Sequence, residues 1–261
     1  MRALDIAATG MEAQQLRVET ISNNLANMST TAYNPRRAEF ADLHYQQARQ
    51  PGSVNAANGA ILPTGVQLGL GVRTEAVSME VTQGALRRTG GELDIAIEGA
   101  GYLEVALPNG ASAYTRDGGL KRTGEGLIVT SEGFPIIPEI TVPEDARAIS
   151  VNADGEVVAS FDNQVQTEVL GRLTLASFVN DKGLEALGGN LFKETAASGP
   201  PSVGDAGTDG RGVFRQGFLE ESGVDAVREI TELIEAQRGY ELNAKVITAS
   251  DQMLGATTQV R

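Results

Sequence analysis

The chain has 261 residues, of which 41% are hydrophobic, so it is long enough for one large or two modest domains with a buried core. Its 34 Asp and Glu outnumber its 21 Lys and Arg, and the formal net charge of -13 disfavours a nucleic-acid binder, which needs a basic face to track phosphates. Cysteine is absent, which excludes disulfides, thiolate metal sites and cysteine nucleophiles. No stretch approaches the roughly 20 apolar residues of a membrane-spanning helix, so we expect no membrane insertion.

The N-terminal stretch from Leu4 to Met28 has heptad spacing, which is typical of a supercoiling helix. One heptad position is occupied by Leu4, Met11, Val18 and Leu25, and the next by Ala7, Gln14, Ile21 and Met28. We predict a helix from near Arg2 to about Asn27, which the hydroxyl side chains of Ser29-Thr30-Thr31 then end. The first residues lack the unbroken apolar core of a cleavable secretory signal, so we expect export, if it occurs, to use an uncleaved N-terminus.

The composition then changes twice before the C-terminal stretch. From 46 to 71 it is rich in Gly, Ala, Asn, Gln and Pro and has few apolar anchors, which predicts an extended connector over 31–71, possibly with a returning segment 208–221. From 72 to 207 apolar residues alternate between frequent turns, which predicts a central all-β domain of short antiparallel strands. The sharpest hairpin signals are Pro108-Asn109-Gly110, between strands at 102–107 and 113–116, and Asp154-Gly155, between 149–152 and 156–160. A further strand is expected over 169–178 and a loop over 196–212.

The C-terminal stretch from Val224 to Leu254 has one apolar stripe at three- and four-residue steps, which predicts a second amphipathic helix. The capping-box-like sequence Ser222-Gly223-Val224-Asp225 precedes it. Because the chain leaves the first helix and enters the second at the same end of the β region, we expect the two helices to be antiparallel. The expected fold class is α+β: a coiled-coil-like inner domain from 1–30 and 222–261, the connector, and the central β domain.

Residues that could carry chemistry do not form a site. His44 is the single histidine, so no second His or Cys exists to build a metal or catalytic centre with it. Gly99-Ala100-Gly101 lacks the third glycine of a dinucleotide loop and precedes a strand pattern. Asn152-Ala153-Asp154-Gly155 lacks the twelfth-position carboxylate of a calcium loop. We therefore predict no enzyme, no catalytic residues, no cofactor and no metal.

Both ends and the centre of the chain resemble bacterial flagellar rod and hook proteins. The resemblance is carried at the N-terminus by 6–15, 21–27 and 30–33, in the centre by Tyr114-Thr115-Arg116-Asp117-Gly118 and Gly133-Phe134-Pro135, and at the C-terminus by 234–245. The family-motif residues are Asn23, Asn24, Leu25, Ala26, Asn27, Gln237, Arg238, Tyr240, Glu241, Asn243 and Lys245. Within the family, the length and the segment 46–71 are most similar to subunits of the distal rod.

The resemblance implies a structural subunit of a hollow helical shaft, which lies in the flagellar basal body, spans the periplasm and transmits motor torque to the hook. The implied partners are copies of the chain, the hook protein, proximal rod proteins, the surrounding P and L ring proteins and the flagellar type III export apparatus. Exported subunits would pass through the lumen, and this chain would itself be exported without a cleaved signal peptide.

The residues expected at the assembly interface are the apolar ones of both terminal helices: Leu4, Met11, Val18, Ile21, Leu25, Ile230, Leu233, Ile234, Tyr240, Ile247 and Leu254. On the sequence pattern alone, an alternative explains the two apolar stripes about as well as assembly does: both helices could pack onto the β region as ordinary core. Heptad spacing with small and polar residues in the seam favours assembly, because such a helix buries too little against one partner. The alternatives are another flagellar axial protein, a β-rich adhesin with a helical stalk and, least favoured, a hydrolase.

Overall fold

The chain divides into two compact units in a computed structural model that describes residues 2–50, 64–161 and 167–259. The first, here called the helical unit, comprises Met1–Ala26, Arg36–Ser78 and Asp225–Arg261. The second, the β unit, comprises Asn27–Pro35 and Met79–Val224. Residues 36–71, most of the expected connector, thus belong to the same unit as the helices.

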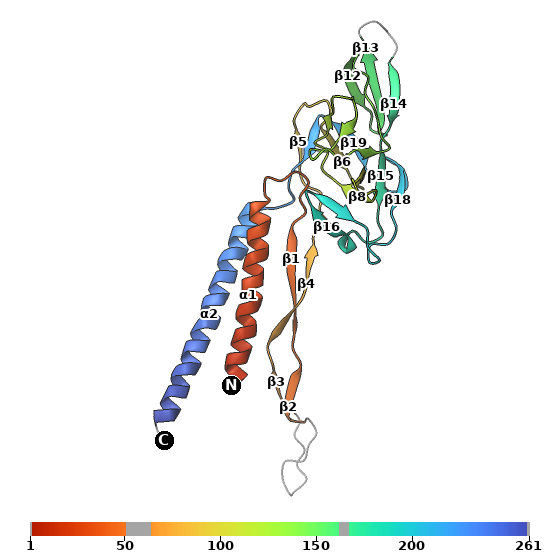
Figure 1. The fold of residues 1–261 in the computed structure, drawn as a ribbon. Coiled ribbons are helices and arrows are strands. Elements are labelled where there is room, and N and C mark those ends of the chain that lie inside the picture. Colours follow the sequence, from red (N-terminus) through yellow and green to blue (C-terminus); the bar gives the residue numbers. More distant parts are fainter. Residues whose placement is uncertain (1, 51–63, 162–166, 260–261) are drawn as a thin grey trace. The chain divides into compact units, whose positions relative to one another are not determined.

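Two long helices dominate the helical unit. α1 (Arg2–Ala26) and α2 (Ala226–Gln259) lie side by side and run in opposite directions (Figure 1). The predicted antiparallel helices are confirmed: α1 ends one residue before the predicted end, while α2 starts two residues later than predicted and continues five residues further. The α+β class is confirmed by these helices together with the antiparallel strands of the β unit.

The start of α2 is capped differently from the expected capping box. Asp225 is the N-cap, since its Oδ1 accepts hydrogen bonds from the backbone N–H of Val227 at 3.0 Å and of Arg228 at 3.3 Å. Ser222 instead accepts from the N–H of Val224, before the helix begins. A carboxylate cap also places negative charge at the positive end of the helix dipole, which a serine does not.

The segment after α1 contains two pairs of strands. β1 (Arg36–Asp42) pairs with β4 (Val72–Met79), and β2 (Tyr45–Arg49) pairs with β3 (Val66–Gly69) in antiparallel register. Pairing satisfies the backbone N–H and C=O groups of this segment. It thereby orders a Gly- and Gln-rich sequence that has few apolar side chains to pack into a core. The rest of the expected connector, 51–63, lies outside the described residues.

Asn24 joins the three parts of the helical unit. Its side chain, only 2% exposed, donates from Nδ2 to the carbonyl of Arg36 at 2.8 Å and to Glu229 Oε2 at 3.2 Å. Its Oδ1 accepts from the N–H of Arg36 at 2.9 Å. One side chain thereby fixes the beginning of β1 against α1 and the first turn of α2, which gives this family-motif residue a structural role.

Short antiparallel strands build the β unit. They are β5 (Leu86–Arg88), β6 (Ile95–Glu98), β7 (Leu103–Ala106), β8 (Ser112–Thr115), β9 (Lys121–Arg122), β10 (Ile128–Val129), β11 (Ile136–Ile137), β12 (Ala146–Val151), β13 (Glu156–Phe161), β14 (Glu168–Arg172), β15 (Thr174–Ser177), β16 (Glu185–Gly188), β17 (Leu191–Lys193), β18 (Ser202–Asp205), β19 (Val213–Gln216) and β20 (Phe218–Glu220), with a 3-10 turn η1 (Asp181–Gly183). The largest sheet has the order β11-β7-β8-β17-β16, and a second has the order β12-β13-β14. The remaining strands pair as β10-β9, β15-β18, β19-β6 and β20-β5.

Both predicted hairpins form. β7 and β8 pair from Leu103 opposite Thr115 to Ala106 opposite Ser112, and Gly110 in their turn has a φ of 79°, a region that glycine adopts without strain. β12 and β13 pair around the turn that contains Gly155, whose φ is 85°. The turn at Asp154-Gly155 is therefore a hairpin connection. This agrees with the sequence analysis, in which the carboxylate at the twelfth position of a calcium loop is absent.

Two strand predictions in the second half of the β unit were wrong. The single strand expected over 169–178 is broken at Leu173, so that β14 pairs with β13 while β15 pairs with β18. Leu173 itself is fully buried in the core, and its N–H donates to the carbonyl of Gly155 at 2.7 Å. The loop expected over 196–212 contains the strand β18, which pairs with β15. The sequence of β18 is polar and contains glycine, so it shows almost no alternation of apolar and polar residues.

The core of the β unit is one large aliphatic cluster beside a smaller aromatic one. The aliphatic cluster is built around inward residues of several strands, including Ile95, Ile97, Leu103, Val105, Val157 and Leu175. In the aromatic cluster the rings of Tyr114 and Phe178 meet edge to face, with centroids 4.9 Å apart. Aromatic pairs in this geometry contribute about 0.5–1.5 kcal/mol beyond the apolar area that they bury.

A buried ion pair crosses the β unit. Arg116 and Glu220 are 5% and 4% exposed, and Arg116 donates from Nε and Nη2 to Glu220 Oε2 at 3.1 and 2.9 Å. Arg116 also donates to the carbonyls of Gly99 and Gly101 at 3.0–3.1 Å, and Glu220 Oε1 accepts from the N–H of Gly84. Gly99 and Gly101, which lack the pattern of a dinucleotide-binding loop, therefore use their carbonyl groups to bind the guanidinium of Arg116.

Replacing Arg116 should destabilise the β unit strongly. Arg116→Met leaves the Glu220 carboxylate buried without a partner, which is expected to cost about 3–5 kcal/mol of unfolding free energy. The matched control is Arg172→Met, because Arg172 pairs with Asp205 at 3.0 Å with both side chains half exposed, and such pairs contribute less than about 1 kcal/mol. Urea unfolding followed by circular dichroism measures both, and equal losses would contradict the buried-pair argument.

Replacing Asp117 should stabilise the β unit in a pH-dependent way. Its Oδ1 accepts from the N–H of Gly119 at 3.0 Å, and burial raises the pKa of its carboxyl above the ordinary 3.8. Because the folded-state pKa is the higher one, the ionised form opposes folding at neutral pH, and this cost disappears as pH falls through the folded pKa. Asp117→Asn keeps the acceptor, so we expect a higher unfolding free energy at pH 7 and a shrinking difference toward pH 4. A difference that does not change with pH would refute this.

Candidate assembly surface

Glycines allow α1 and α2 to approach closely. A methyl group at Gly10 would lie 2.9 Å from Asn243 Nδ2, and one at Gly239 would lie 3.1 Å from Gln14 Cδ. Each glycine therefore lies directly beneath an amide side chain of the other helix. A glycine in a helix interior destabilises the helix by about 1 kcal/mol relative to alanine. Here the two glycines permit close packing of the helices, which a side chain at either position would prevent.

Polar side chains complete the contact between the helices. Arg17 Nη2 lies 3.5 Å from Glu232 Oε2 and 3.7 Å from Glu235 Oε2. These pairs are partly exposed and contribute little to stability. Burial raises the pKa of Glu229 above its ordinary value, and the hydrogen bond from Asn24 opposes that shift.

The seam of the helix pair therefore occupies one heptad stripe of α1. Gly10, Gln14, Arg17 and Asn24 contact α2, and the buried Ala7 and Ile21 continue the same three- and four-residue spacing. Of the two heptad positions in the sequence, the one with Ala7, Gln14 and Ile21 thus lies in the seam. The bulkier position, with Leu4, Met11, Val18 and Leu25, remains only half-buried.

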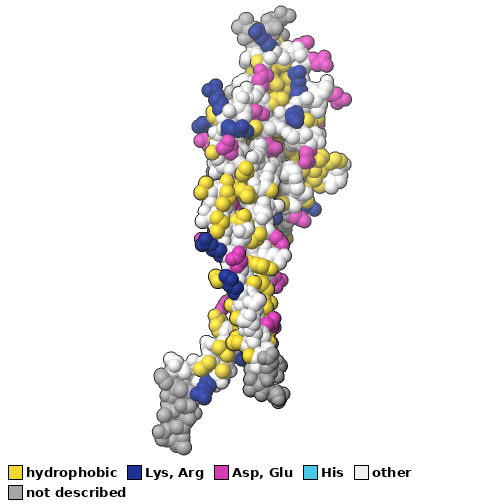
Figure 2. Space-filling view, turned by 90° about the vertical axis from the view of Figure 1, so that its left-hand side faces the viewer, with side chains coloured by type: hydrophobic (Ala, Val, Ile, Leu, Met, Phe, Trp, Pro, Cys, Tyr) yellow, Lys and Arg dark blue, Asp and Glu magenta, His cyan; other side chains and the backbone are white. Residues whose placement is uncertain are grey.

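Most residues expected at an assembly interface retain exposed surface. Leu4, Met11, Val18, Leu25, Leu233, Ile247 and Leu254 are half-buried, and Ile230, Ile234 and Tyr240 are exposed. Ile21 differs, because at 3% exposure its side chain packs inside the helical unit. Figure 2 shows hydrophobic side chains along the surface of the helical unit, next to charged ones.

The sequence reasoning missed four exposed apolar residues of α2: Val227, Leu242, Val246 and Met253. Val227 is 76% and Met253 is 64% exposed. Leu242, Val246 and Met253 recur at i, i+4 and i+11, a heptad stripe of their own that a single-stripe interpretation of α2 overlooks. α2 therefore exposes apolar side chains in more than one direction.

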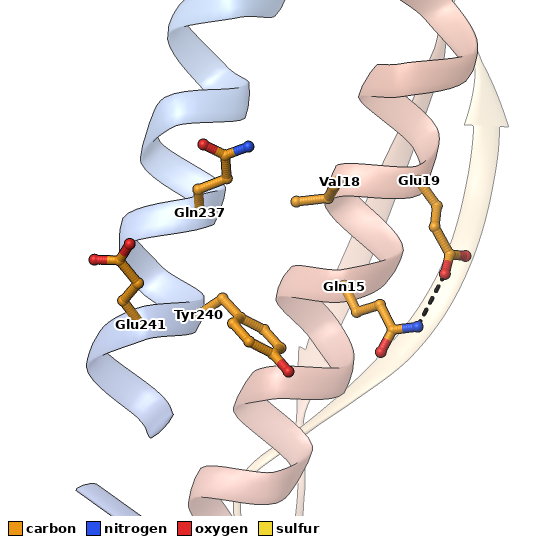
Figure 3. A pocket seen from close by; sticks show the side chains of 6 residues that line it. All are labelled: Gln15, Val18, Glu19, Gln237, Tyr240 and Glu241. Carbon is orange, nitrogen blue, oxygen red and sulfur yellow. Dashed lines mark hydrogen bonds between the residues drawn. The ribbon is translucent and has the colours of Figure 1, made fainter. Parts of the chain in front are cut away.

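A groove of about 490 Å³ lies between the two helices. It is lined by Gln15, Val18, Glu19, Gln237, Tyr240 and Glu241. Val18 and Tyr240 extend from opposite helices into the space between them, while Glu19 and Glu241 lie on the outer sides of the two helices (Figure 3). Gln15 Nε2 donates to Glu19 Oε1 at 3.0 Å and so holds one of these carboxylates in place.

The family-motif residues serve different parts of this surface. Asn24 and Asn243 contact the partner helix, Gln237, Tyr240 and Glu241 line the groove, and Asn23, Ala26, Arg238 and Lys245 are exposed. Leu25 is half-buried, and Asn27 belongs to the β unit, where its Oδ1 accepts from the hydroxyl of Thr30.

Other chemistry has little support in the described part of the chain. His44 is exposed between β1 and β2, and no cluster of three or more metal-ligating side chains occurs among the residues that the structure describes. No helix within those residues is long and apolar enough to cross a membrane.

Comparisons with known proteins agree on one family. Three family models match: "Flagella basal body rod protein" over 4–33, "Flagellar hook protein FlgE/F/G D1 domain" over 96–159 and "Flagellar basal body rod FlgEFG protein C-terminal" over 215–260. They cover most of α1, the strands from β7 to β12 with most of β6 and β13, and the whole of α2. The matched regions thus include both helices of the assembly surface.

Curated relatives match over nearly their whole length. The flagellar basal-body rod protein FlgG of Caulobacter vibrioides is 49% identical over 100% of both chains. Those of Agrobacterium fabrum and of Buchnera aphidicola from Acyrthosiphon pisum are 49% and 45% identical, over 97% and 99% of both chains. A solved structure of the Helicobacter pylori flagellar hook protein FlgE2 matches 71% of this chain and 43% of its own, at 15% identity and a TM-score of 0.25. On the strength of the full-length matches, the chain belongs to the flagellar basal-body rod protein FlgG family.

Proposed function

We propose that this chain polymerises through α1 and α2 into the distal rod of the bacterial flagellum. As a member of the family it is a structural subunit of the flagellar basal body. The observation that carries the proposal is the division of side chains on the helix pair. Apart from the buried Ile21, mainly small and polar residues form the contact inside the chain, whereas most bulky apolar residues keep exposed surface.

The energetics favour burial of these residues against neighbouring copies. Each fully buried Val, Leu or Ile side chain contributes roughly 1.5–3 kcal/mol relative to an exposed one. Val18 and Tyr240 lie in the groove, while Ile230, Ile234 and Leu242 lie elsewhere on α2, so the apolar surface faces more than one direction. Contacts of this kind that repeat by one operator without closure produce an open helical polymer.

The resulting assembly is a hollow shaft that carries motor torque across the periplasm to the hook. Torque is transmitted by many subunit contacts, so the function requires no catalytic site. In this proposal the shaft meets proximal rod proteins at one end and the hook protein at the other, and turns inside the P and L rings. Subunits leave through the flagellar type III export apparatus without a cleaved signal peptide and travel through the lumen.

Introducing a charge into the groove should block assembly without unfolding the chain. Val18→Asp places a carboxylate beside Glu19 and Glu241, and we expect complementation of a motility-deficient null strain to be lost. The β unit should stay folded, as judged by its urea unfolding midpoint. Val179→Asp is the matched control because Val179 is 94% exposed and lies in the β unit, and it should leave motility unchanged. Normal motility of the Val18→Asp strain would contradict the proposal.

The helices should be the least protected part of the isolated chain. Few apolar side chains are buried in their contact, Ala7, Ile21 and Ala236 among them, whereas the β unit has a large aliphatic core. We expect amides of α1 and α2 to exchange about a hundredfold or more faster than those of β6 and β7 in the monomer, and to become protected on polymerisation. Equal protection of helices and core strands in the monomer would contradict the idea that neighbours complete this layer.

A further inference from the structure

Several charged side chains of the helix pair have no ion pair within the described residues. The pairs that do form on the helices use Arg17, Arg228, Glu232 and Glu235. Among the side chains without such a pair are the acidic Glu19 and Glu241 and the basic Arg238 and Lys245. Glu241 and Lys245, spaced as an i, i+4 pair, are not within ion-pair distance of each other in this part of the chain. Charges of both signs thus remain available to other molecules.

The two acidic side chains border the groove. Between them, Val18 and Tyr240 provide an apolar floor (Figure 3). An arginine or lysine fits this combination, since its aliphatic stem packs on apolar surface while its charged end reaches a carboxylate. An acidic or purely apolar guest would leave both carboxylates without a counter-charge.

The two basic side chains lie on a face of α2 that also carries Glu241 and that is turned away from the contact with α1. Gly239 and Asn243 face α1, and Arg238, one residue before Gly239, points about 100° away from it around the helix. Lys245 follows Arg238 by seven residues, which returns it to the same face about 10.5 Å along the axis. Ile234 and Leu242, 46% and 61% exposed, flank Arg238 at i-4 and i+4. We call Ile234, Arg238, Leu242 and Lys245 the basic ridge.

We propose that the basic ridge of one copy docks into the groove of a second copy, with Arg238 between Glu19 and Glu241. The inference rests on the proposed function and specifies which surfaces meet. Ridge and groove carry opposite charge, and both combine that charge with exposed apolar side chains. Because ridge and groove consist of different residues of one chain, with Glu19 of α1 in the groove, the contact is heterologous: a copy bound through its ridge still offers its groove.

Disulfide cross-linking tests this contact directly, because the chain has no cysteine of its own. The double variant Glu19→Cys/Arg238→Cys is expressed as the full chain in flagellated cells that lack their own copy, and basal bodies are treated with a mild oxidant. We expect a ladder of dimers, trimers and longer species on a non-reducing gel. Each single-cysteine variant should give monomer, since a heterologous contact joins one cysteine of each kind. Glu19→Cys/Val179→Cys is the control and should also stay monomeric.

Charge reversal provides a second measurement that does not depend on cysteines. Glu19→Arg and Arg238→Glu should each reduce the swimming rate and the yield of rods at least tenfold. The double variant Glu19→Arg/Arg238→Glu should restore at least half of both, because every contact in the polymer then again joins opposite charges. Glu168→Arg, an exposed glutamate on β14, is the matched control and should have no effect.

The outcomes separate this inference from the proposed function. A ladder in the double-cysteine variant, or rescue by the double reversal, supports the docking. Motile cells whose double-cysteine chains do not cross-link, or single reversals that the double variant does not rescue, overturn the docking while leaving the rod function intact. Wild-type chain that is absent from purified rods would overturn both.

Discussion

The close contact between α1 and α2 is the constraint on which the rest of the helical unit depends. A helix pair joined through Gly10, Gly239 and amide side chains is narrow, and it leaves bulky residues on its outer faces. With larger apolar residues in the seam, the pair would be more stable alone but would have less surface for its neighbours. Specific hydrogen bonds set its register instead: Asn24 fixes the first turn of α2 and the start of β1 against the end of α1. The pair thus has a defined geometry without a large core of its own.

The β unit has the opposite design. Its strands are short and fall into several small sheets, so no single ladder organises it, and an extensive aliphatic cluster holds them together. Arg116 adds a polar link between residues more than a hundred apart, since it reaches the carbonyls before β7 and the carboxylate at the end of β20. The stability of this unit therefore comes from a large core within one chain.

The sequence predicted the elements with strong periodicity and missed those held by long-range pairing. The heptads located α1, and Asn109-Gly110 located a hairpin, because local spacing and turn chemistry determine both. The ribbons β1-β4 and β2-β3 and the strand β18 have weak alternation, and distant backbone partners define them. The position of the cap was misjudged by one helical turn, because both Ser222 and Asp225 are good N-cap residues and only the geometry distinguishes them.

The candidate surface was predictable in its residue types and less so in its layout. Apolar spacing identified Val18 and Tyr240 as outward residues, which the groove includes. It could not show that Ile21 belongs to the seam, because helical phase relative to a partner depends on where Gly10 and Gly239 permit close approach. The second stripe of Leu242, Val246 and Met253 was missed for a related reason. When a helix carries two apolar stripes, their residues together no longer show a single clear helical periodicity.

The placement of an acidic groove and a basic ridge on the same chain has a consequence for growth. In a polymer built from such contacts, one tip ends in vacant grooves and the other in uncovered ridges. The two tips are therefore chemically distinct: one attracts cationic partners and the other anionic ones. Such a filament has an inherent direction, and any protein that starts it must differ in charge from any protein that terminates it.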